Sequence, residues 1–342
     1  MTDLTRLSRR SFMVMPLALA ACRLGEDSFR VGGSTMGTSY NVVAANVPGR
    51  VRETDLRAAV DTALNAVNRQ MSNWDPNSEI SKFNAHMDTD PVSVSPELAE
   101  VMEAAETVHA ASGARFDTTV GPLIELWGFG APGAAPLPGE SDIAAAQSRS
   151  GHANTLEVGP GTLRKRQPEA QVYLAAIGKG YGADQVGRAL ESLGITDYMV
   201  EIGGDLYASG RNTDGLTWQI GIETPAANRR DVLKVVGVSD LGLASSGDYR
   251  NFFQQDGQRF SHIVDPRTGR PVTHKTASAT VLAENAMLAD AWATAFHTMG
   301  REEGMAVGED LGLAVLFTER VGGADAPGFR MTASSRFKAL TS

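Results

Sequence analysis

A run of short strand-like segments in the second half of the chain most constrains its fold. Segments 198–202, 205–209, 218–223, 232–238 and 242–246 are rich in branched and aromatic residues and follow one another closely. A regular alternation of strands with crossover helices, which parallel sheets require, is missing from this region. The chain is therefore expected to be an α+β protein with an antiparallel sheet.

Helical patterns precede and follow this run. From Glu53, the apolar residues Leu56, Val60, Leu64, Val67 and Met71 recur every three or four positions, which is typical of an amphipathic helix. Ser95 before Pro96 predicts a second helix start, with the helix running to about His109. Further helices are expected at 181–193, 286–299 and 301–312, and further strands at 37–45 and 313–319. No Pro/Ser-rich or charged linker divides the chain, so one compact domain is predicted.

The charge of the chain excludes one class of partner. The formal net charge is −9, and no cluster of Lys and Arg follows the first ten residues. Binding to a phosphate backbone needs a basic face, so no nucleic-acid partner is expected. With 342 residues, 42% of them hydrophobic, the chain is long enough to bury a substantial core.

The first 21 residues are interpreted as an export signal. The pair Arg9 and Arg10 precedes an apolar run that is too short to span a bilayer. This pattern is twin-arginine-like, although an ordinary signal with two arginines is the alternative. The segment "LAAC" resembles a lipobox that ends at Cys22, the single cysteine of the chain. The prediction is lipidation at Cys22, a tether over 22–31 and a folded domain over 32–342.

Two segments carry candidate catalytic chemistry. "FSHIVDPRTGRPV", residues 260–272, places His262 and Asp265 before a turn set by Pro266 and Gly269, where a side chain can be aimed at a ligand. A hydrogen-bonded loop histidine is the alternative. In "NAMLADAWATA", Asp290 and Thr294 stand four residues apart on one helix face among small alanines. Their hard oxygens suit Mg²⁺, while tight helix packing with a structural carboxylate remains the other interpretation.

Other common sites are excluded or weak. Glycine-rich turns, such as "IGGD" at 202–205 and "GKGYG" at 178–182, suit an anion such as a pyrophosphate. Neither a dinucleotide fingerprint nor a phosphate-binding loop with its lysine is present. The histidines show no zinc-ligand spacing, and His109 and His297, in predicted helices, are expected to be structural or exposed. No serine-nucleophile elbow occurs.

Together, the motifs resemble those of one known family. "GSTMGTSY", "MSNWDPNSEISKFN", "FDTTVGPLIELWGFG", "AAIGKGYGAD", "IGGD", "SSGDYRNFF", "SHIVDPRTGRPV" and "LADAWATA" occur in the order seen in ApbE-type FAD:protein FMN transferases. The resemblance runs from about Gly33 to Gly300. It implies a single compact ApbE-like, T-fold-like domain, with an antiparallel sheet and flanking helices.

The resemblance also implies the chemistry. FMN would be transferred from FAD to a Thr or Ser hydroxyl of a target flavoprotein, in a covalent, Mg²⁺-dependent reaction that releases AMP. His262 or Asp265 would be the catalytic base. The FAD site would be formed by Met36, Trp74, Arg115, Phe116, Asp117, Lys179 and Ile263. The metal site would be formed by Asp290, Thr294 and the main-chain oxygens of Ala176 and Ala293. Tyr249 and Arg250 would lie near the site without an assigned role.

The implied partners are acceptor flavoprotein subunits of membrane electron-transfer complexes. The implied place is the periplasmic face of the cytoplasmic membrane, with Cys22 as the lipid anchor. An FAD pyrophosphatase that releases FMN and AMP would use the same residues, and a non-enzymatic FAD-binding lipoprotein is a further alternative.

The chain departs from the family pattern at four positions. Tyr173 stands where an Asp is common, Ala175 where a Gly is usual and Arg115 where a small residue is usual. Trp74 replaces a common tyrosine, which keeps an aromatic face but removes the hydroxyl.

Overall fold

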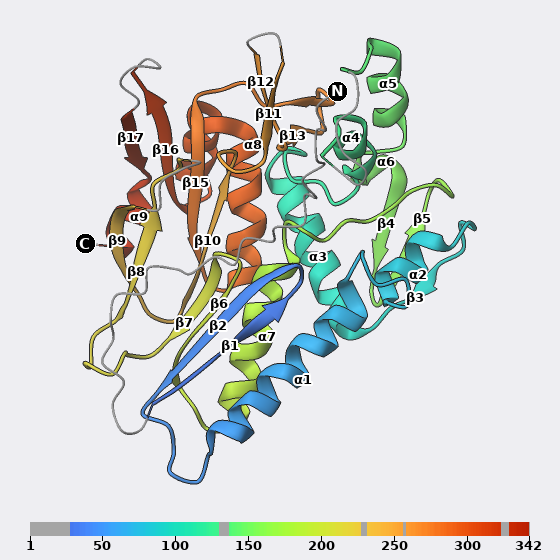
Figure 1. Ribbon diagram of the computed structural model, residues 1–342. Coiled ribbons are helices and arrows are strands. Elements are labelled where there is room, and N and C mark those ends of the chain that lie inside the picture. The colour runs from blue at the N-terminus through green and yellow to red at the C-terminus, as the bar shows by residue number, and fades with distance from the viewer. Residues whose placement is uncertain (1–27, 130–136, 227–230, 256–257, 323–327, 342) are drawn as a thin grey trace, which may run out of the picture.

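An eight-stranded antiparallel sheet organises the molecule (Figure 1). The computed structural model describes residues 28–129, 137–226, 231–255, 258–322 and 328–341. In spatial order the strands are β1 (Phe29–Thr35), β2 (Thr38–Ala45), β6 (Asp197–Ile202), β7 (Asp205–Ser209), β10 (Leu241–Gly247), β15 (Thr276–Ala283), β16 (Ala314–Val321) and β17 (Gly328–Ala333). The predicted α+β class with an antiparallel sheet is therefore confirmed.

Three long helices form the layer on one face of this sheet. They are α1 (Glu53–Met71), α7 (Gly178–Ser192) and α8 (Ala286–Asp310). The five residues of the α1 pattern are all buried, as the periodicity predicted. α3 (Pro96–Ala111) packs on α8 in the main core and begins at the predicted cap, where the Ser95 side chain accepts from Leu98 N. The helical layer therefore follows directly from apolar periodicity and capping.

The other face of the sheet is covered by a hairpin and a short helix. β8 (Trp218–Glu223) pairs with β9 (Val232–Val238), and α9 (Ser335–Leu340) packs beside them. Two of the five predicted closely spaced strands thus leave the main sheet and form a second layer. They bury Trp218, Ile220 and Val236 against it.

Two glycines let α8 approach its neighbours closely. A Cβ at Gly180 in α7 would lie 2.1 Å from the main-chain oxygen of Ala286, and one at Gly242 in β10 would lie 2.3 Å from main-chain atoms of Asn285. Asn285 caps α8 by accepting from Leu288 N, and the Asp184 carboxylate accepts from Ala286 N and Met287 N. The start of α8 is therefore fixed against both the sheet and α7.

The remaining elements surround the open end of this core. α2 (Glu79–Ala85) lies beside a small sheet of β3 (Val92–Ser93), β5 (Thr162–Lys165) and β4 (Leu156–Gly159). A cap consists of α4 (Gly121–Leu126), α5 (Glu140–Ser148), α6 (His152–Thr155), β11 (Phe252–Gln255), β12 (Gln258–Ser261), β13 (Val264–Asp265) and β14 (Arg270–Pro271). Trp127 and Phe260 stack within the cap with ring centroids 5.7 Å apart.

Some boundaries differ from the sequence predictions. β1 already begins at Phe29, because residues 29–31 pair with β2, so the expected tether over 22–31 ends earlier than predicted. The two helices expected at 286–299 and 301–312 form one kinked helix, α8, which ends at Asp310 and whose non-helical residue is Gly300 with a φ of 75°. The export signal and Cys22 lie outside the described residues. Among the described residues, no helix is long and apolar enough to cross a membrane.

Candidate active site

A cavity of about 330 Å³ lies where the cap meets the open end of the core. It is bordered by the first turn of α7, the turn between β6 and β7, the end of β10, the middle of α8 and the segment after β12. The predicted site residues that line it are Arg115, Phe116, Asp117, Ala176, Lys179, His262, Ile263, Asp290 and Thr294. Segments far apart in the sequence are therefore brought to one hollow.

A lysine and two buried carboxylates form the polar centre of the cavity. The Lys179 ammonium pairs closely with Asp205 and lies 3.4 Å from an Asp290 oxygen. Burial alone would lower the pKa of Lys179, but the charges of Asp205 and Asp290 outweigh it and raise that pKa. Burial, followed by the Asp290 charge, raises the pKa of Asp205. The cluster therefore holds one cation between two carboxylates inside a cavity.

Asp205 is a functional candidate that the sequence reasoning missed. The "IGGD" segment predicts an anion-binding glycine turn and is one of the family motifs, but neither interpretation assigns a role to its carboxylate. Gly203 and Gly204 both have positive φ, at 59° and 101°, so the chain reverses there and Asp205 enters the cavity as the first residue of β7. The sequence does contain a signal for this role, namely a carboxylate directly after a tight glycine turn. A side chain at such a turn lies at the end of the sheet, where it can contact a ligand.

The donor set around Asp290 fits a hard divalent cation. Asp290, Asp205 and Thr294 offer carboxylate and hydroxyl oxygens from β7 and α8, and Mg²⁺ prefers such ligands. In the described part of the chain, no group of three or more His, Cys, Asp or Glu has metal-site geometry, so oxygens other than these two carboxylates would have to complete the ligand set. Ala176 lines the cavity, whereas Ala293 is packed in the core next to Thr294.

His262 has the geometry of a general base. Its Nδ1 lies 2.9 Å from the main-chain oxygen of Asn251. A carbonyl oxygen only accepts, so Nδ1 carries the proton and Nε2 keeps its lone pair. Burial lowers the pKa of His262 below its usual 6.5, so the imidazole is neutral near pH 7. The ring therefore presents a basic nitrogen beside the cavity that it lines.

Asp265, the second predicted base, is engaged elsewhere. Its Oδ2 accepts from Arg115 Nη1 at 2.9 Å, and its Oδ1 accepts from Arg267 N at 3.0 Å. Val264 and Pro266 line the cavity, but Asp265 itself does not. Of the two candidates, His262 is therefore the better placed to take a proton from a bound substrate.

Asp117 organises the loop on which it lies. Its Oδ1 accepts from Thr119 N and Thr119 Oγ1 at 2.7 and 2.6 Å, and its Oδ2 accepts from His152 N at 2.9 Å. The side chain is buried, yet it still reaches the cavity wall beside Phe116. These contacts give the cap a fixed polar wall.

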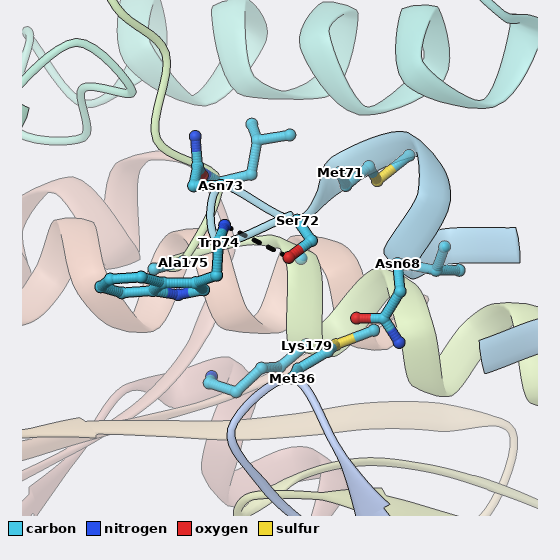
Figure 2. Close-up of a pocket in the computed structure, with 11 residues that line it drawn as sticks. Met36, Asn68, Met71, Ser72, Asn73, Trp74, Ala175 and Lys179 are labelled. Carbon is cyan, nitrogen blue, oxygen red and sulfur yellow. Dashed lines mark hydrogen bonds between the residues drawn. The ribbon is translucent and has the colours of Figure 1, made fainter. Parts of the chain in front are cut away.

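A second cavity of about 160 Å³ adjoins the first, and both are lined by Ala175 and Lys179 (Figure 2). Met36 lies in it at the turn between β1 and β2, and Trp74 lies in the loop between α1 and α2. The Trp74 side chain is 81% exposed, which leaves an aromatic face free at the rim of the cavity. A long ligand can therefore extend from Lys179 toward Trp74.

A third hollow of about 210 Å³ lies between the sheet and the β8–β9 hairpin, and includes Tyr249 and Arg250. The Arg250 guanidinium donates to both carboxylate oxygens of Glu223 at 2.7 Å. Gly203, Ser245 and Gly247 line both this hollow and the first cavity. Tyr249 and Arg250 thus lie near the site, as expected.

Tyr173, where the family pattern has an Asp, has a packing role in this chain. Its ring packs directly against Gly121, where a Cβ would lie 1.9 Å from a ring carbon. Its hydroxyl donates to Glu125 at 2.9 Å and contacts Gln171 at 2.7 Å. Tyr173 therefore holds the start of α4 and is not among the residues that line the three cavities.

Comparisons with known proteins agree with this geometry. The model of the ApbE family matches residues 36–317. A curated FAD:protein FMN transferase of Vibrio cholerae is 41% identical over 328 residues, covering 95% of this chain and 96% of the relative. The solved structure of the flavin transferase ApbE from Vibrio cholerae is similar with a TM-score of 0.82 and 40% identity, covering 92% of this chain and 99% of that one. The apo form of the Pseudomonas stutzeri flavinyl transferase ApbE is similar with a TM-score of 0.83 and 34% identity, covering 92% and 96%.

Proposed function

Because this chain belongs to the ApbE family, we infer that it is an FAD:protein FMN transferase whose reaction takes place in the cavity around Lys179 and His262. The observation that carries this inference is the meeting, in one cavity, of a cation between two carboxylates and a neutral histidine. Transfer from a pyrophosphate requires positive charge near the phosphates and a base for the incoming hydroxyl.

The reaction follows from these groups. A Ser or Thr hydroxyl of the acceptor protein attacks the phosphorus on the FMN side of FAD. A new phosphoester bond forms, the bond from that phosphorus to the bridging oxygen breaks, and AMP leaves with the electron pair. The hydroxyl proton passes to His262 Nε2, the nitrogen left free by the Nδ1 contact with Asn251. Lys179 faces the same cavity and is placed to offset the charge of the phosphates.

Mg²⁺ fits the oxygen ligands of this cavity. Asp290 and Thr294 would hold it, with Asp205 as a further carboxylate and main-chain oxygens of Ala176 and Ala293 as the family pattern implies. When bound, the ion would neutralise pyrophosphate charge. Lys179 already pairs with both carboxylates, so this cluster carries no net positive charge, and a divalent ion would supply the charge that the phosphates need.

The two adjoining cavities suit the two-part shape of FAD. Lys179 lines both of them, so the pyrophosphate would lie near Lys179 while one ring system would extend toward Met36 and Trp74. An exposed indole offers a stacking face for a flat ring. Phe116, Asp117 and Ile263 line the first cavity and would contact the other half.

The acceptor and the location are part of the same proposal. The acceptors would be flavoprotein subunits of membrane electron-transfer complexes. The enzyme would be exported and held at the periplasmic face of the cytoplasmic membrane by a lipid on Cys22. The supporting observations are the paired arginines, the short apolar run and the "LAAC" segment of residues 1–22.

Mass spectrometry of an acceptor protein tests the proposed function. An unflavinylated acceptor subunit is incubated with the purified enzyme, FAD and Mg²⁺. The expected result is an acceptor mass gain equal to FMN minus water, with AMP released in equal amount. Chelation of the metal and the Asp290→Asn variant should each reduce the transfer rate by at least about 100-fold, since a charge at the phosphates is lost.

Two other outcomes would contradict this proposal. Conversion of FAD to FMN and AMP without acceptor labelling would make the protein an FAD pyrophosphatase. FAD that binds but stays intact, with the acceptor present, would leave a flavin-binding protein without this activity.

A further inference from the structure

Arg115 is a buried guanidinium that links three parts of the active site. It lies after the end of α3, lines the main cavity and is only 8% exposed. Burial of a cation is costly unless its charge is matched. The contacts of Arg115 therefore show what this position is built to hold.

The contacts of Arg115 reach two separate elements. Nη1 donates to Asp265 Oδ2 at 2.9 Å and lies 3.5 Å from the main-chain oxygen of Thr298. Nη2 pairs closely with Glu303. Thr298 and Glu303 lie on either side of the Gly300 kink in α8. The Arg115 guanidinium therefore contacts α8 on both sides of its kink and joins it to the β13–β14 hairpin.

This hairpin carries the segment that includes His262. Asp265 lies three residues after His262, and the main chain between them is held by Val272 N donating to Ile263 O at 2.9 Å. The turn is closed by Gly269 N donating to Asp265 O at 2.8 Å, and Trp127 Nε1 donates to Gly269 O at 2.8 Å. Main-chain bonds shape the hairpin, while Asp265 supplies a side-chain link from it to Arg115 and α8.

The charges around Arg115 alternate. Arg267, on the outer side, lies 3.8 Å from Asp265 and 3.8 Å from Glu303, and its side chain is 45% exposed. Exposed pairs of this kind contribute little. The buried pair is different, because a carboxylate that loses its buried partner cannot be compensated by solvent. Arg115 is thus the member of the network on which the position of Asp265 depends.

We propose that Arg115 is a positioning residue for FMN transfer, which holds Asp265 against α8 and thereby fixes the segment that carries His262. This proposal rests on the proposed function for its consequence in catalysis. Asp265 is then an anchor of the loop, and His262 is the base. Small displacements of a catalytic group are costly, since a shift of about 1 Å can lower a rate about 100-fold.

The chemistry explains why arginine is used here. Its two terminal nitrogens point to different carboxylates from one rigid plane, and a lysine offers a single point charge. Arg115→Lys should therefore keep part of the function by pairing with Asp265, while Arg115→Met should keep the volume and lose both pairs.

Kinetics and hydrogen exchange together test the proposal. Arg115→Met and Asp265→Asn should each lower kcat for transfer about 30- to 100-fold, with the KM for FAD changed by less than about threefold. The double variant should be no slower than the slower single variant, because both act through one contact. Arg115→Lys should recover at least about fivefold in kcat over Arg115→Met. Amide exchange at Gly269 and Val272 should accelerate at least about tenfold in Arg115→Met.

Arg270→Met is the matched control. It removes an arginine from the same hairpin, but one whose partner is the 87% exposed Glu140. The control should leave kcat and amide exchange close to wild type. If Arg115→Met fails to fold, Asp265→Asn is measured in its place, since it keeps the shape and removes the charge.

The outcomes separate this proposal from the proposed function. Normal kcat or unchanged amide exchange in Arg115→Met would overturn it. A raised KM for FAD with unchanged kcat would also overturn it and would make Arg115 a direct FAD ligand. Its buried Nε, which has no hydrogen-bond partner among the described residues, would be available for that role. If wild type transfers no FMN, the proposed function fails, and the exchange data still decide whether Arg115 fixes the loop.

Discussion

At the scale of single residues, the tautomer of His262 determines what the site can do. The Asn251 carbonyl fixes the proton on Nδ1, and burial lowers the pKa of the ring below 6.5. A lowered pKa means that the neutral, basic form persists as the pH falls and is lost only below that value. Transfer should therefore be independent of pH from about 7 to 8 and should decline on acidification through a pKa below 6.5.

The His262→Gln variant checks this assignment. Loss of a general base lowers rates roughly 100- to 10,000-fold, so transfer should become slow while FAD still binds. The acid limb of the kcat profile should disappear in the variant, since no titrating base remains. An acid limb that persists with the same midpoint would assign the base to another group.

Individual site residues differ in how far the sequence could identify them. His262, Asp290 and Thr294 were singled out by their local setting, and all three line the cavity. For Asp205, the local sequence indicates only that it ends a glycine turn. The partners of Arg115 could not be read from the chain, because Asp265 and Glu303 lie 150 and 188 residues away from it. Such contacts depend on the assembled fold and not on local spacing.

At the scale of helices and strands, hydrophobic periodicity predicted the elements that bury only one face. α1 and α3 followed their patterns closely. β15 was missed, because almost every residue from Thr276 to Ala283 is buried and no alternation remains to be seen. The single helix α8 was expected as two, since nothing local shows that the chain resumes its helix after Gly300.

The crossing of α7 and α8 yields a prediction at the same scale. A Cβ at Gly180 would lie 2.1 Å from Ala286 O, so Gly180→Ala must push the helices apart. In an isolated helix this change would be favourable by about 1 kcal/mol. The overlap with main chain should reverse the sign and cost about 1–3 kcal/mol. FMN transfer should also fall, because Lys179 and Asp290 sit on the two helices.

Gly49→Ala is the control for this experiment. Gly49 lies in the exposed segment between β2 and α1. A Cβ at Gly49 would have no atom of the described residues within 4 Å. Thermal unfolding should show a lower Tm for Gly180→Ala and little change for Gly49→Ala. A Tm for Gly180→Ala at or above the wild-type value would show that the two helices can separate without cost.

At the scale of the whole molecule, the class of fold was predictable and the order of strands was not. Closely spaced strands indicated antiparallel pairing, but β2 pairs with β6 across about 160 residues, as Asn41 with Glu201 shows. The two-layer placement of β8 and β9 depends on what covers the far face of the sheet. The cavity exists only once these distant pieces meet, so its residues were connected in advance by resemblance to a family and not by local pattern.

The proposed attachment of the whole molecule to a membrane gives the last prediction. The formal net charge is −9, and residues 1–21 contain Arg6, Arg9, Arg10 and Asp3, so their removal would leave −11. Anionic lipids repel such a domain, so the proposed location predicts that membrane binding depends on a lipid at Cys22. Cys22→Ser should move the protein from the membrane fraction to the soluble fraction, with FMN transfer to a soluble acceptor unchanged in vitro. A Cys22→Ser protein that stays with the membrane would place the anchor elsewhere, since Cys22 is the one cysteine available for a thioether.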